Sequence, residues 1–361
     1  MTAKTTVAIL GGTGYVGRLL CRRLVDHPDF CVGAVVGSSR SVGRAFKEVW
    51  ETKEAALAAN YGTLWEPLPF PPELNGTVIV SLDAVTPGRC TYVVSCLSPD
   101  AADVEDDVRR RGLPLFSMSP LNRAGNAFVL EADPTRFLRE VRAGRDVFKS
   151  PNCVVCGTVL VVQALKERFG LRGLCVTTMQ SISGRGDAMY TGERITHNVM
   201  PLANSGEGTE RCICDELKEL LVCEDVSVRA YRLGVHVGHT VDVRIRLGGA
   251  SPLPTLQEVL GALSAFSPMA HHEDALLLHS TPKHPLVLQT GSGTPQPRQR
   301  TSIRTACSLQ EGMQVLVGNV EVQRDGWDVV LTLVVHNLIR GAYGAMLQMM
   351  EIHLRETRGA S

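Results

Sequence analysis

A cysteine lies at residue 153, where the polar turn Ser150-Pro151-Asn152 passes into the apolar stretch 154–160. The apolar stretch predicts a buried helix with Cys153 at its N-terminus. There the positive end of the helix dipole favours the thiolate, which is a good nucleophile. A buried structural cysteine is the alternative that this local sequence leaves open. Cys153 is therefore a candidate nucleophile for which a base must be found.

The segment Arg232 to Thr240 offers such a partner. Arg232 and His239 are separated mainly by apolar residues and glycine, so on an extended segment both side chains could reach one cleft. Arginine suits the bidentate binding of a carboxylate, and histidine transfers protons near neutral pH. His236 competes with His239 for the role of base, and either histidine could be an ordinary surface residue.

A glycine-rich turn, Gly11 to Gly17, follows the apolar run 5–10 and precedes residues with helical apolar spacing at 18–24. Glycines in a strand-turn-helix unit allow a tight turn and a close approach of the backbone to phosphate, and the helix N-terminus offers N–H donors to the anion. The GxxGxxG spacing is a variant of the dinucleotide-binding motif. A plain glycine turn is the alternative.

The residues after the second predicted strand, 30–36, indicate which dinucleotide is bound. An NAD enzyme usually has an acidic residue there for the ribose hydroxyls. Here Ser38, Ser39 and Arg40 occupy that place. Because a guanidinium and two hydroxyls suit a 2′-phosphate, NADP is favoured over NAD, unless Arg40 is only a surface arginine.

The elements that position these residues fall into two groups. Up to residue 150, predicted strands and helices alternate, as in a doubly wound parallel sheet. Beyond Pro151, period-two alternation predicts long, half-exposed antiparallel strands. Further strands are expected at 76–80, 92–97, 113–116, 226–232, 240–247, 315–320 and 327–335, helices at about 101–111 and 341–350, and a long connection at 268–300.

We therefore predict an α/β protein with a Rossmann-type NADP-binding domain and a central α+β domain for catalysis and dimerisation. The first comprises residues 1–150, rejoined by 336–361, and the second comprises 151–335. A chain of 361 residues fits two domains of common size, and 44% hydrophobic with 20% charged residues is a globular composition.

The charge balance and the spacing of the cysteines limit which partners and metals the protein is expected to bind. Lys+Arg and Asp+Glu both number 37, so no global field attracts nucleic acid or an anionic membrane. The 11 cysteines lack the paired spacing of a zinc site, so no metal is expected. There is no signal-peptide run at the start and no apolar stretch of about 20 residues, so a cytoplasmic protein with reduced thiols is expected.

The order and spacing of these motifs resemble the aspartate-semialdehyde dehydrogenase family, especially its archaeal and fungal branch. The resemblance runs over nearly the whole chain. It is carried by residues 11–17, 37–41, 150–153, 178–184, 198–201 followed by 205–207, 232–239, 295–298 and 336–342.

The resemblance implies that Cys153 attacks the aldehyde carbon, that His239 takes and returns protons, and that Gln180 orients the thioester. The backbone N–H of Cys153 and the Asn152 amide are candidate donors to the carbonyl oxygen. The implied substrate-binding residues are Arg232 for the α-carboxylate, Asn152 and Arg123 for the acyl phosphate, and Glu207 or Glu210 for the ammonium. The implied NADP-binding residues are Gly11, Thr13, Gly14, Tyr15, Val16, Gly17, Ser38, Ser39, Arg40, Ser98, Gly184 and Asn337.

Enzymes of this family reduce L-4-aspartyl phosphate to L-aspartate 4-semialdehyde, for lysine, threonine and methionine biosynthesis, and a homodimer or homotetramer is implied. This chain departs from the family pattern at Val154 to Cys156, at Arg185, at Gly234 and after Glu207, where Arg211 could replace a lysine. The alternatives are a related acyl-phosphate reductase, such as N-acetyl-glutamyl-phosphate reductase, an acyl-CoA reductase, and a non-catalytic NADP-binding regulator.

Overall fold

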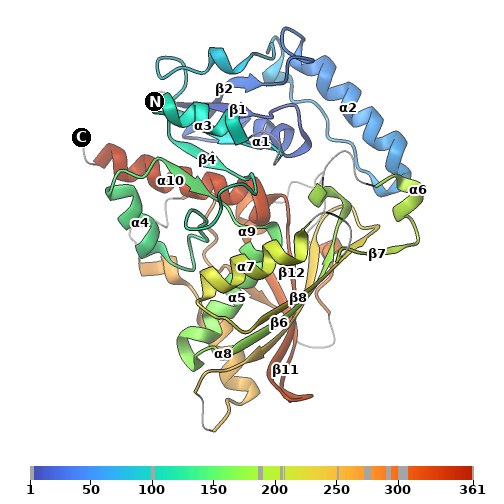
Figure 1. Ribbon diagram of the computed structural model, residues 1–361, viewed down its shortest axis with the longest axis vertical. Helices are drawn as coiled ribbons and strands as arrows, with labels where there is room; N and C mark the ends of the chain where they lie inside the picture. The colour runs from blue at the N-terminus through green and yellow to red at the C-terminus, as the bar shows by residue number, and fades with distance from the viewer. Residues whose placement is uncertain are drawn as a thin grey trace.

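The computed structural model describes residues 4–98, 102–185, 190–203, 206, 208–249, 252–271, 278–289, 294–299 and 308–359. These residues form two β-sheets, one above the other in Figure 1, with helices packed around them. The N-terminal half builds the upper sheet, and the lower sheet is built from residues beyond 170. The predicted α/β class is therefore confirmed.

The upper sheet has five parallel strands in the order β2-β1-β3-β4-β5. Its strands are β1 (Thr5–Leu10), β2 (Phe30–Val36), β3 (Tyr92–Ser95), β4 (Leu115–Ser117) and β5 (Val147–Lys149). The helices between them are α1 (Tyr15–Val25), α2 (Phe46–Tyr61), α3 (Ala102–Arg110) and α4 (Pro134–Arg142). The strands are apolar and almost wholly buried, which is typical of a parallel sheet covered by helices.

The run 76–80, predicted as a strand, forms only isolated bridges. Val80 pairs with Val36 in parallel, whereas Val78 pairs with Ala45 in antiparallel orientation. Because the run changes its partner after two residues, no continuous ladder forms and the strand prediction is wrong.

The lower sheet has seven strands in the order β10-β11-β12-β9-β6-β8-β7. Its strands are β6 (Gly173–Gln180), β7 (Val199–Pro201), β8 (Val226–Leu233), β9 (His239–Arg246), β10 (Leu286–Leu288), β11 (Val315–Arg324) and β12 (Trp327–Val335). The expectation of antiparallel strands holds fully for β9 and β12, whereas β8 and β11 each have one antiparallel and one parallel neighbour. β6 lies between β8 and β9 and pairs with β8 in parallel, because helix α7 carries the chain across before β8 begins.

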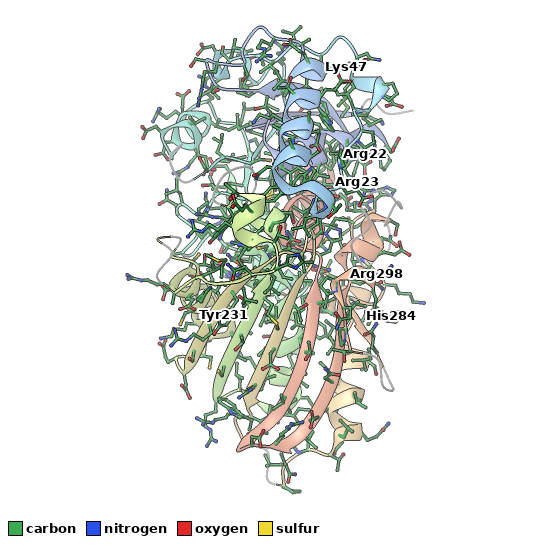
Figure 2. The ribbon with its side chains drawn as sticks, turned by 90° about the vertical axis from the view of Figure 1, so that its right-hand side faces the viewer. Arg22, Arg23, Lys47, Tyr231, His284 and Arg298 are labelled. Atoms are coloured by element: carbon green, nitrogen blue, oxygen red, sulfur yellow. The ribbon has the colours of Figure 1, made fainter. Side chains whose placement is uncertain are left out.

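Helices α5 (Cys153–Phe169), α7 (Thr209–Leu221) and α8 (Leu256–Ala265) pack together on one face of the lower sheet. Figure 2 looks onto the other face, where no helix lies in front of the strands. The remaining short helices are α6 (Gly192–Ile195) and α9 (Leu309–Met313), with 3-10 turns at 62–64, 72–74, 82–84, 182–185, 268–271 and 297–299.

The C-terminal helix α10 (Gly344–Gly359) returns to the upper sheet. It follows a short π-helical segment, Ile339–Tyr343, and contacts α4 and β4. In Figure 1 it is the red helix that lies beside α4, below β4. This return places residues 337–342 beside the start of α5, so the end of the chain helps to build the region between the two sheets.

Candidate active site

A pocket of about 430 Å³ lies where the two sheets meet, and most of the predicted site residues line it. Its walls come from the glycine turn, from the segment after β3, from the start of α5 and from the ends of β6 and β8. The lining residues include Gly14, Tyr15, Val16, Ser98, Arg123, Asn152, Cys153, Gln180, Gly184, Arg232 and Asn337. The pocket therefore joins the predicted cofactor loop to the predicted nucleophile.

Cys153 is the first residue of α5, as its sequence context predicts. Asn152 caps the helix: its side-chain oxygen accepts the N–H of Val154 at 3.0 Å. This contact uses the amide oxygen, so the Asn152 NH₂ group is left as a donor toward the pocket. The nucleophile and its capping residue thus share one rigid turn.

Burial and charge act on the Cys153 thiol in opposite directions. Burial raises its pKa above the ordinary value, and the nearby Arg232 and Arg123 guanidiniums lower it. The net effect is upward, so the helix N-terminus does not make this thiol acidic in the way the sequence suggested. A thiolate here depends on close hydrogen-bond donors.

His239 provides one such donor. Its Nε2 lies 3.1 Å from the Cys153 sulfur, and its Nδ1 accepts the backbone N–H of Ser181 at 3.0 Å. Because Nδ1 is an acceptor, the ring proton sits on Nε2 and points at the sulfur. Burial and the neighbouring Arg232 lower the pKa of His239 well below the ordinary histidine value, so the ring is neutral at pH 7. His236 instead contacts Tyr15, at 3.3 Å.

Gln180 and Arg232 occupy paired positions on adjacent strands, at the ends of β6 and β8. Both side chains are almost fully buried and both line the pocket. One terminal nitrogen of Arg232 donates to the Ser181 carbonyl at 2.9 Å, and its guanidinium lies 6.0 Å from the centre of the Tyr190 ring. A rigid, buried guanidinium is suited to a carboxylate of a small ligand.

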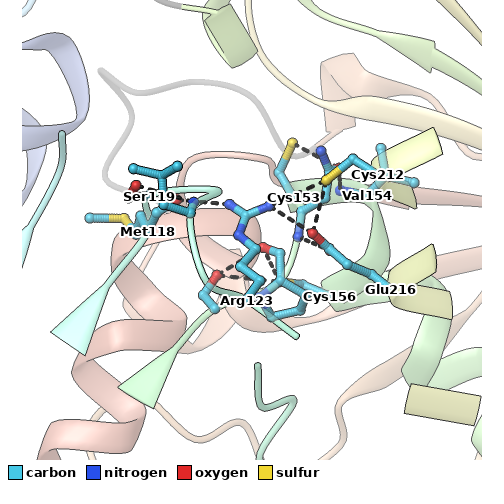
Figure 3. A network of polar contacts seen from close by, with 12 residues as sticks. Met118, Ser119, Arg123, Cys153, Val154, Cys156, Cys212 and Glu216 are labelled. Atoms are coloured by element: carbon cyan, nitrogen blue, oxygen red, sulfur yellow. Dashed lines mark hydrogen bonds and ion pairs between the residues drawn. The ribbon is translucent and has the colours of Figure 1, made fainter. Parts of the chain in front are cut away.

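Arg123 enters the pocket from the turn after β4. Its guanidinium pairs with Glu216 at 2.9 Å and donates to the Met118 carbonyl at 2.8 Å. Figure 3 shows Arg123 between that turn and Glu216 on α7. Glu216 also accepts the backbone N–H of Asn152. Sequence reasoning missed Glu216, although it falls on the apolar face of α7 with Ile213 and Leu217.

Of the two residues expected to bind a substrate ammonium, only Glu210 is among the described residues, and it does not line the pocket. Glu207 lies outside the described residues. The Glu210 carboxylate accepts the N–H of Ala230 at 2.9 Å and does not line the pocket. Arg211 is exposed and pairs with Asp215 at 3.6 Å. Helix α7 presents the uncharged residues Thr209 and Cys212 to the pocket instead.

The glycine turn has the form that a phosphate-binding loop requires. Gly14 is the N-cap of α1 and offers no side chain to cap it, so the first N–H groups of the helix stay available to an anion. A Cβ on Gly17 would lie 2.5 Å from the Gly11 carbonyl oxygen, so only glycine fits there. The main-chain oxygen of Thr13 accepts from Arg18 at 2.7 Å.

Ser38, Ser39 and Arg40 are exposed in the loop that follows β2, outside the lining of the pocket. The N–H of Gly12 donates to the carbonyl of Val36 at 3.2 Å, which places this loop beside the glycine turn. A nucleotide that begins at the turn could extend toward Arg40, as the sequence analysis expects.

Asn337 joins the cofactor side of the pocket to the His239 side. Its side-chain oxygen accepts the N–H of Gly238 at 2.8 Å, and its amide donates to the Ser183 hydroxyl at 3.1 Å. The Ser181 hydroxyl donates to the same Asn337 oxygen at 3.3 Å and lies 3.2 Å from His239 Nδ1. The two serines are site residues that sequence reasoning missed, although they lie within the segment 178–184.

Gly341 is a further missed residue, and it packs directly on the nucleophile. A Cβ at this position would lie 2.5 Å from the Cys153 Cβ and 2.7 Å from its Cα. The neighbouring Arg340 fixes this turn: its guanidinium pairs with the buried Glu131 at 2.5 and 2.8 Å. The turn at the end of β12 thus forms the wall behind Cys153.

Among the described residues, no group of three or more His, Cys, Asp or Glu side chains could hold a metal ion. In the same part of the chain, no helix is long and apolar enough to span a membrane.

Comparisons with known proteins agree with this arrangement. Residues 6–167 match the family described as semialdehyde dehydrogenase, NAD binding domain. The chain is 27% identical to the aspartate-semialdehyde dehydrogenase of Trichophyton rubrum, with 96% of each chain covered. It is also 27% identical to that of Methanothermobacter thermautotrophicus, with 96% of this chain and 98% of the relative covered.

Solved structures support the same fold. The aspartate semialdehyde dehydrogenase of Candida albicans, solved with NADP, superposes with a TM-score of 0.78 at 24% identity, over 98% of this chain and 99% of that one. The corresponding enzyme of Vibrio cholerae, complexed with ASA, has a TM-score of 0.74 at 17% identity, over 98% and 99% of the two chains.

Proposed function

Since the chain belongs to the semialdehyde dehydrogenases by its NAD-binding domain, and is similar to aspartate-semialdehyde dehydrogenases over 96% of its length, we propose that it catalyses their reaction. This is the NADPH-dependent reduction of L-4-aspartyl phosphate to L-aspartate 4-semialdehyde and phosphate, and its reverse. The observation that carries the proposal is a helix-terminal thiol 3.1 Å from a buried histidine, in one pocket with two arginines and the glycine turn.

In the proposed mechanism the Cys153 thiolate attacks the acyl carbon and displaces phosphate, leaving a thioester on the enzyme. The Nε2–H of His239 stabilises the thiolate and would then donate a hydrogen bond to the substrate oxygen as negative charge develops on it. The Cys153 N–H and the Asn152 amide would donate to that oxygen. Gln180 holds the thioester in position.

The two arginines would bind the two anionic ends of the substrate. Arg232, rigid and buried at the end of β8, is proposed to hold the α-carboxylate. Arg123, beside Asn152, is proposed to hold the phosphate. A small dianionic substrate can therefore be bound by a protein whose formal net charge is zero.

The cofactor is NADP. The uncapped N-terminus of α1 suits its pyrophosphate, and Ser38, Ser39 and Arg40 would hold the 2′-phosphate. Its nicotinamide end would be held by residues that line the same pocket as Cys153, among them Gly14, Ser98, Gly184 and Asn337. When bound, NADPH supplies the hydride that reduces the acyl carbon.

Phosphate-dependent reduction of NADP⁺ with L-aspartate 4-semialdehyde tests the proposal, comparing the unchanged protein with Cys153→Ala and offering NAD⁺ in parallel. We expect turnover by the unchanged protein, faster with NADP⁺, and none by the variant. Turnover that survives in Cys153→Ala would exclude the thioester route. Cofactor binding without turnover of any acyl phosphate or aldehyde would indicate a regulator.

A related reductase is the second candidate, and one observation favours it. The part of α7 that lines the pocket offers Thr209 and Cys212, which cannot neutralise an ammonium. A substrate with an acylated or absent amino group would need no such partner. N-acetyl-glutamate semialdehyde and succinic semialdehyde, assayed beside L-aspartate 4-semialdehyde, decide between the two.

We also propose that the protein is a cytoplasmic homodimer or homotetramer divided into domains as the sequence analysis expects. The face of the lower sheet without helices, seen in Figure 2, includes half-buried residues such as Tyr231 and Thr240, and it is the surface that a second copy would cover. A monodisperse monomer in light scattering would exclude the assembly.

A further inference from the structure

Glu216 is a buried carboxylate for which the mechanism above has no use. It is 7% exposed and lies on the apolar face of α7 with Ile213 and Leu217, both fully buried. Burying a carboxylate costs free energy unless its charge is paired and its oxygens accept hydrogen bonds. The groups that pair with Glu216 therefore indicate what it does.

The two oxygens of Glu216 join separate parts of the site. Oε1 accepts from the Arg123 guanidinium at 2.9 Å and from the Cys212 thiol at 3.0 Å, and Oε2 accepts the backbone N–H of Asn152 at 2.5 Å. Figure 3 shows these contacts converging beside Cys153. The carboxylate thus ties the turn that carries Arg123 to the turn that carries the nucleophile.

Glu216 also changes the charge that an entering anion meets. The charged groups facing Cys153 are Arg232, Arg123 and Glu216, and the titratable groups beside it are the neutral His239 and the thiols of Cys156 and Cys212, whose pKa values burial raises. Without Glu216 the Arg123 guanidinium would face the thiol without its carboxylate. With it, Arg123 is already paired, and phosphate must share that guanidinium with a carboxylate.

We propose that Glu216 is a positioning residue that holds Arg123 against the turn before Cys153 and, as the counter-charge of Arg123, limits how tightly the pocket binds phosphate. Weak retention of phosphate suits a site that must release this product in one direction and take it up in the other. The inference rests on the proposed function only in assigning phosphate to Arg123.

Glu216→Gln removes the charge while nearly keeping the shape, and alkylation of Cys153 by iodoacetamide reports the result. The rate would be followed against pH, with and without inorganic phosphate, and peptide mass spectrometry would separate Cys153 from Cys212. We expect the midpoint of the pH profile to fall by about half a unit or more. Half-protection by phosphate should need about threefold less of it.

Glu219→Gln is the matched control. Glu219 lies on the same helix and accepts the N–H of Gly125 at 2.9 Å, in the same turn as Arg123, but contacts neither Arg123 nor Asn152. Its variant should keep the midpoint and the phosphate dependence of the unchanged protein. Glu216→Asp keeps the charge, so a shift in this variant as large as in Glu216→Gln would overturn the electrostatic part of the proposal.

Should Glu216→Gln not fold, a pair of variants without Arg123 gives the same decision. Arg123→Gln leaves the carboxylate unopposed near the thiol, and Arg123→Gln with Glu216→Gln removes both charges. The midpoint must then be lower in the double variant, and equal midpoints would overturn the proposal. Because alkylation needs no turnover, this outcome is independent of whether aspartyl phosphate proves to be the substrate.

Discussion

Gly341→Ala is expected to disable the nucleophile while leaving the rest of the protein folded. The added Cβ would lie 2.5 Å from the Cβ and 2.7 Å from the Cα of Cys153. Carbon atoms in ordinary contact are about 3.5 Å apart or more, so one of the two segments must move by about 1 Å. Cys153 begins a helix and Gly341 lies in a short π-helical segment fixed by Arg340, so neither segment can yield at low cost.

The size of the effect follows from this displacement. A misplacement of about 1 Å in a reacting group can lower the rate about 100-fold, and overpacking a core typically costs about 1–3 kcal/mol. We therefore expect kcat/KM for L-aspartate 4-semialdehyde to fall by about 100-fold. The KM for NADP⁺ should change little, since the glycine turn is not touched.

The assay is phosphate-dependent reduction of NADP⁺, combined with urea unfolding and with alkylation of Cys153. Gly261→Ala is the control, because a Cβ there meets nothing within 4 Å and the residue lies inside helix α8. This control should gain about 0.5–1 kcal/mol of stability without losing activity. A folded Gly341→Ala protein with unchanged kcat/KM would refute the reasoning that this contact positions the nucleophile.

Three further predictions concern the cofactor loop, a buried ion pair and pH. Arg40→Ala should raise the KM for NADP⁺ about tenfold and leave that for NAD⁺ unchanged, and equal effects on both would show that Arg40 does not meet the 2′-phosphate. Glu131→Gln leaves the Arg340 guanidinium buried without its carboxylate, so urea unfolding should show a loss of about 3 kcal/mol. Burial lowers the pKa of His353 to about 4 in the folded protein, whereas an unfolded histidine titrates near about 6.5. As the pH falls, the unfolded chain therefore binds a proton at His353 before the folded protein does. The free energy of unfolding should therefore fall by up to about 3 kcal/mol as the pH drops from about 6.5 to about 4. Urea unfolding at pH 7 and at pH 4.5 should show a smaller difference for His353→Gln than for the unchanged protein.

Local patterns in the sequence predict those parts of the fold that depend on local structure. The glycine turn at 11–17 and the helix that begins at Cys153 are set by residues within a few positions of each other. The place of β6 between β8 and β9 is a long-range pairing, and alternation within β8 is the same whether its neighbour runs parallel or antiparallel. A local pattern also does not show which segment a strand pairs with, and this explains the wrong strand prediction at 76–80, where the pairing partner changes within the run.

The residues of α7 that face the pocket were not predicted, because the side of the helix that faces inward was wrongly assigned. Successive residues of a helix are turned by about 100°, so an offset of one position moves a side chain from the pocket to the solvent. The resemblance to the family's acidic run favoured Glu210 and Arg211, whereas the structure turns Thr209, Cys212 and Glu216 inward. The burial of Ile213 and Leu217 shows the correct phase, and this apolar spacing was present in the sequence.

His239 shows what residue types alone leave undetermined. The sequence predicts a histidine near the nucleophile, and the distance of 3.1 Å to the sulfur agrees with this prediction. The direction of proton transfer, however, depends on the backbone N–H of Ser181, which points at Nδ1 and keeps the ring proton on Nε2. A ring held in this state stabilises a thiolate better than it accepts the proton of a thiol. The chemistry of the site is therefore set by a main-chain contact at the end of β6, where no side-chain pattern could reveal it.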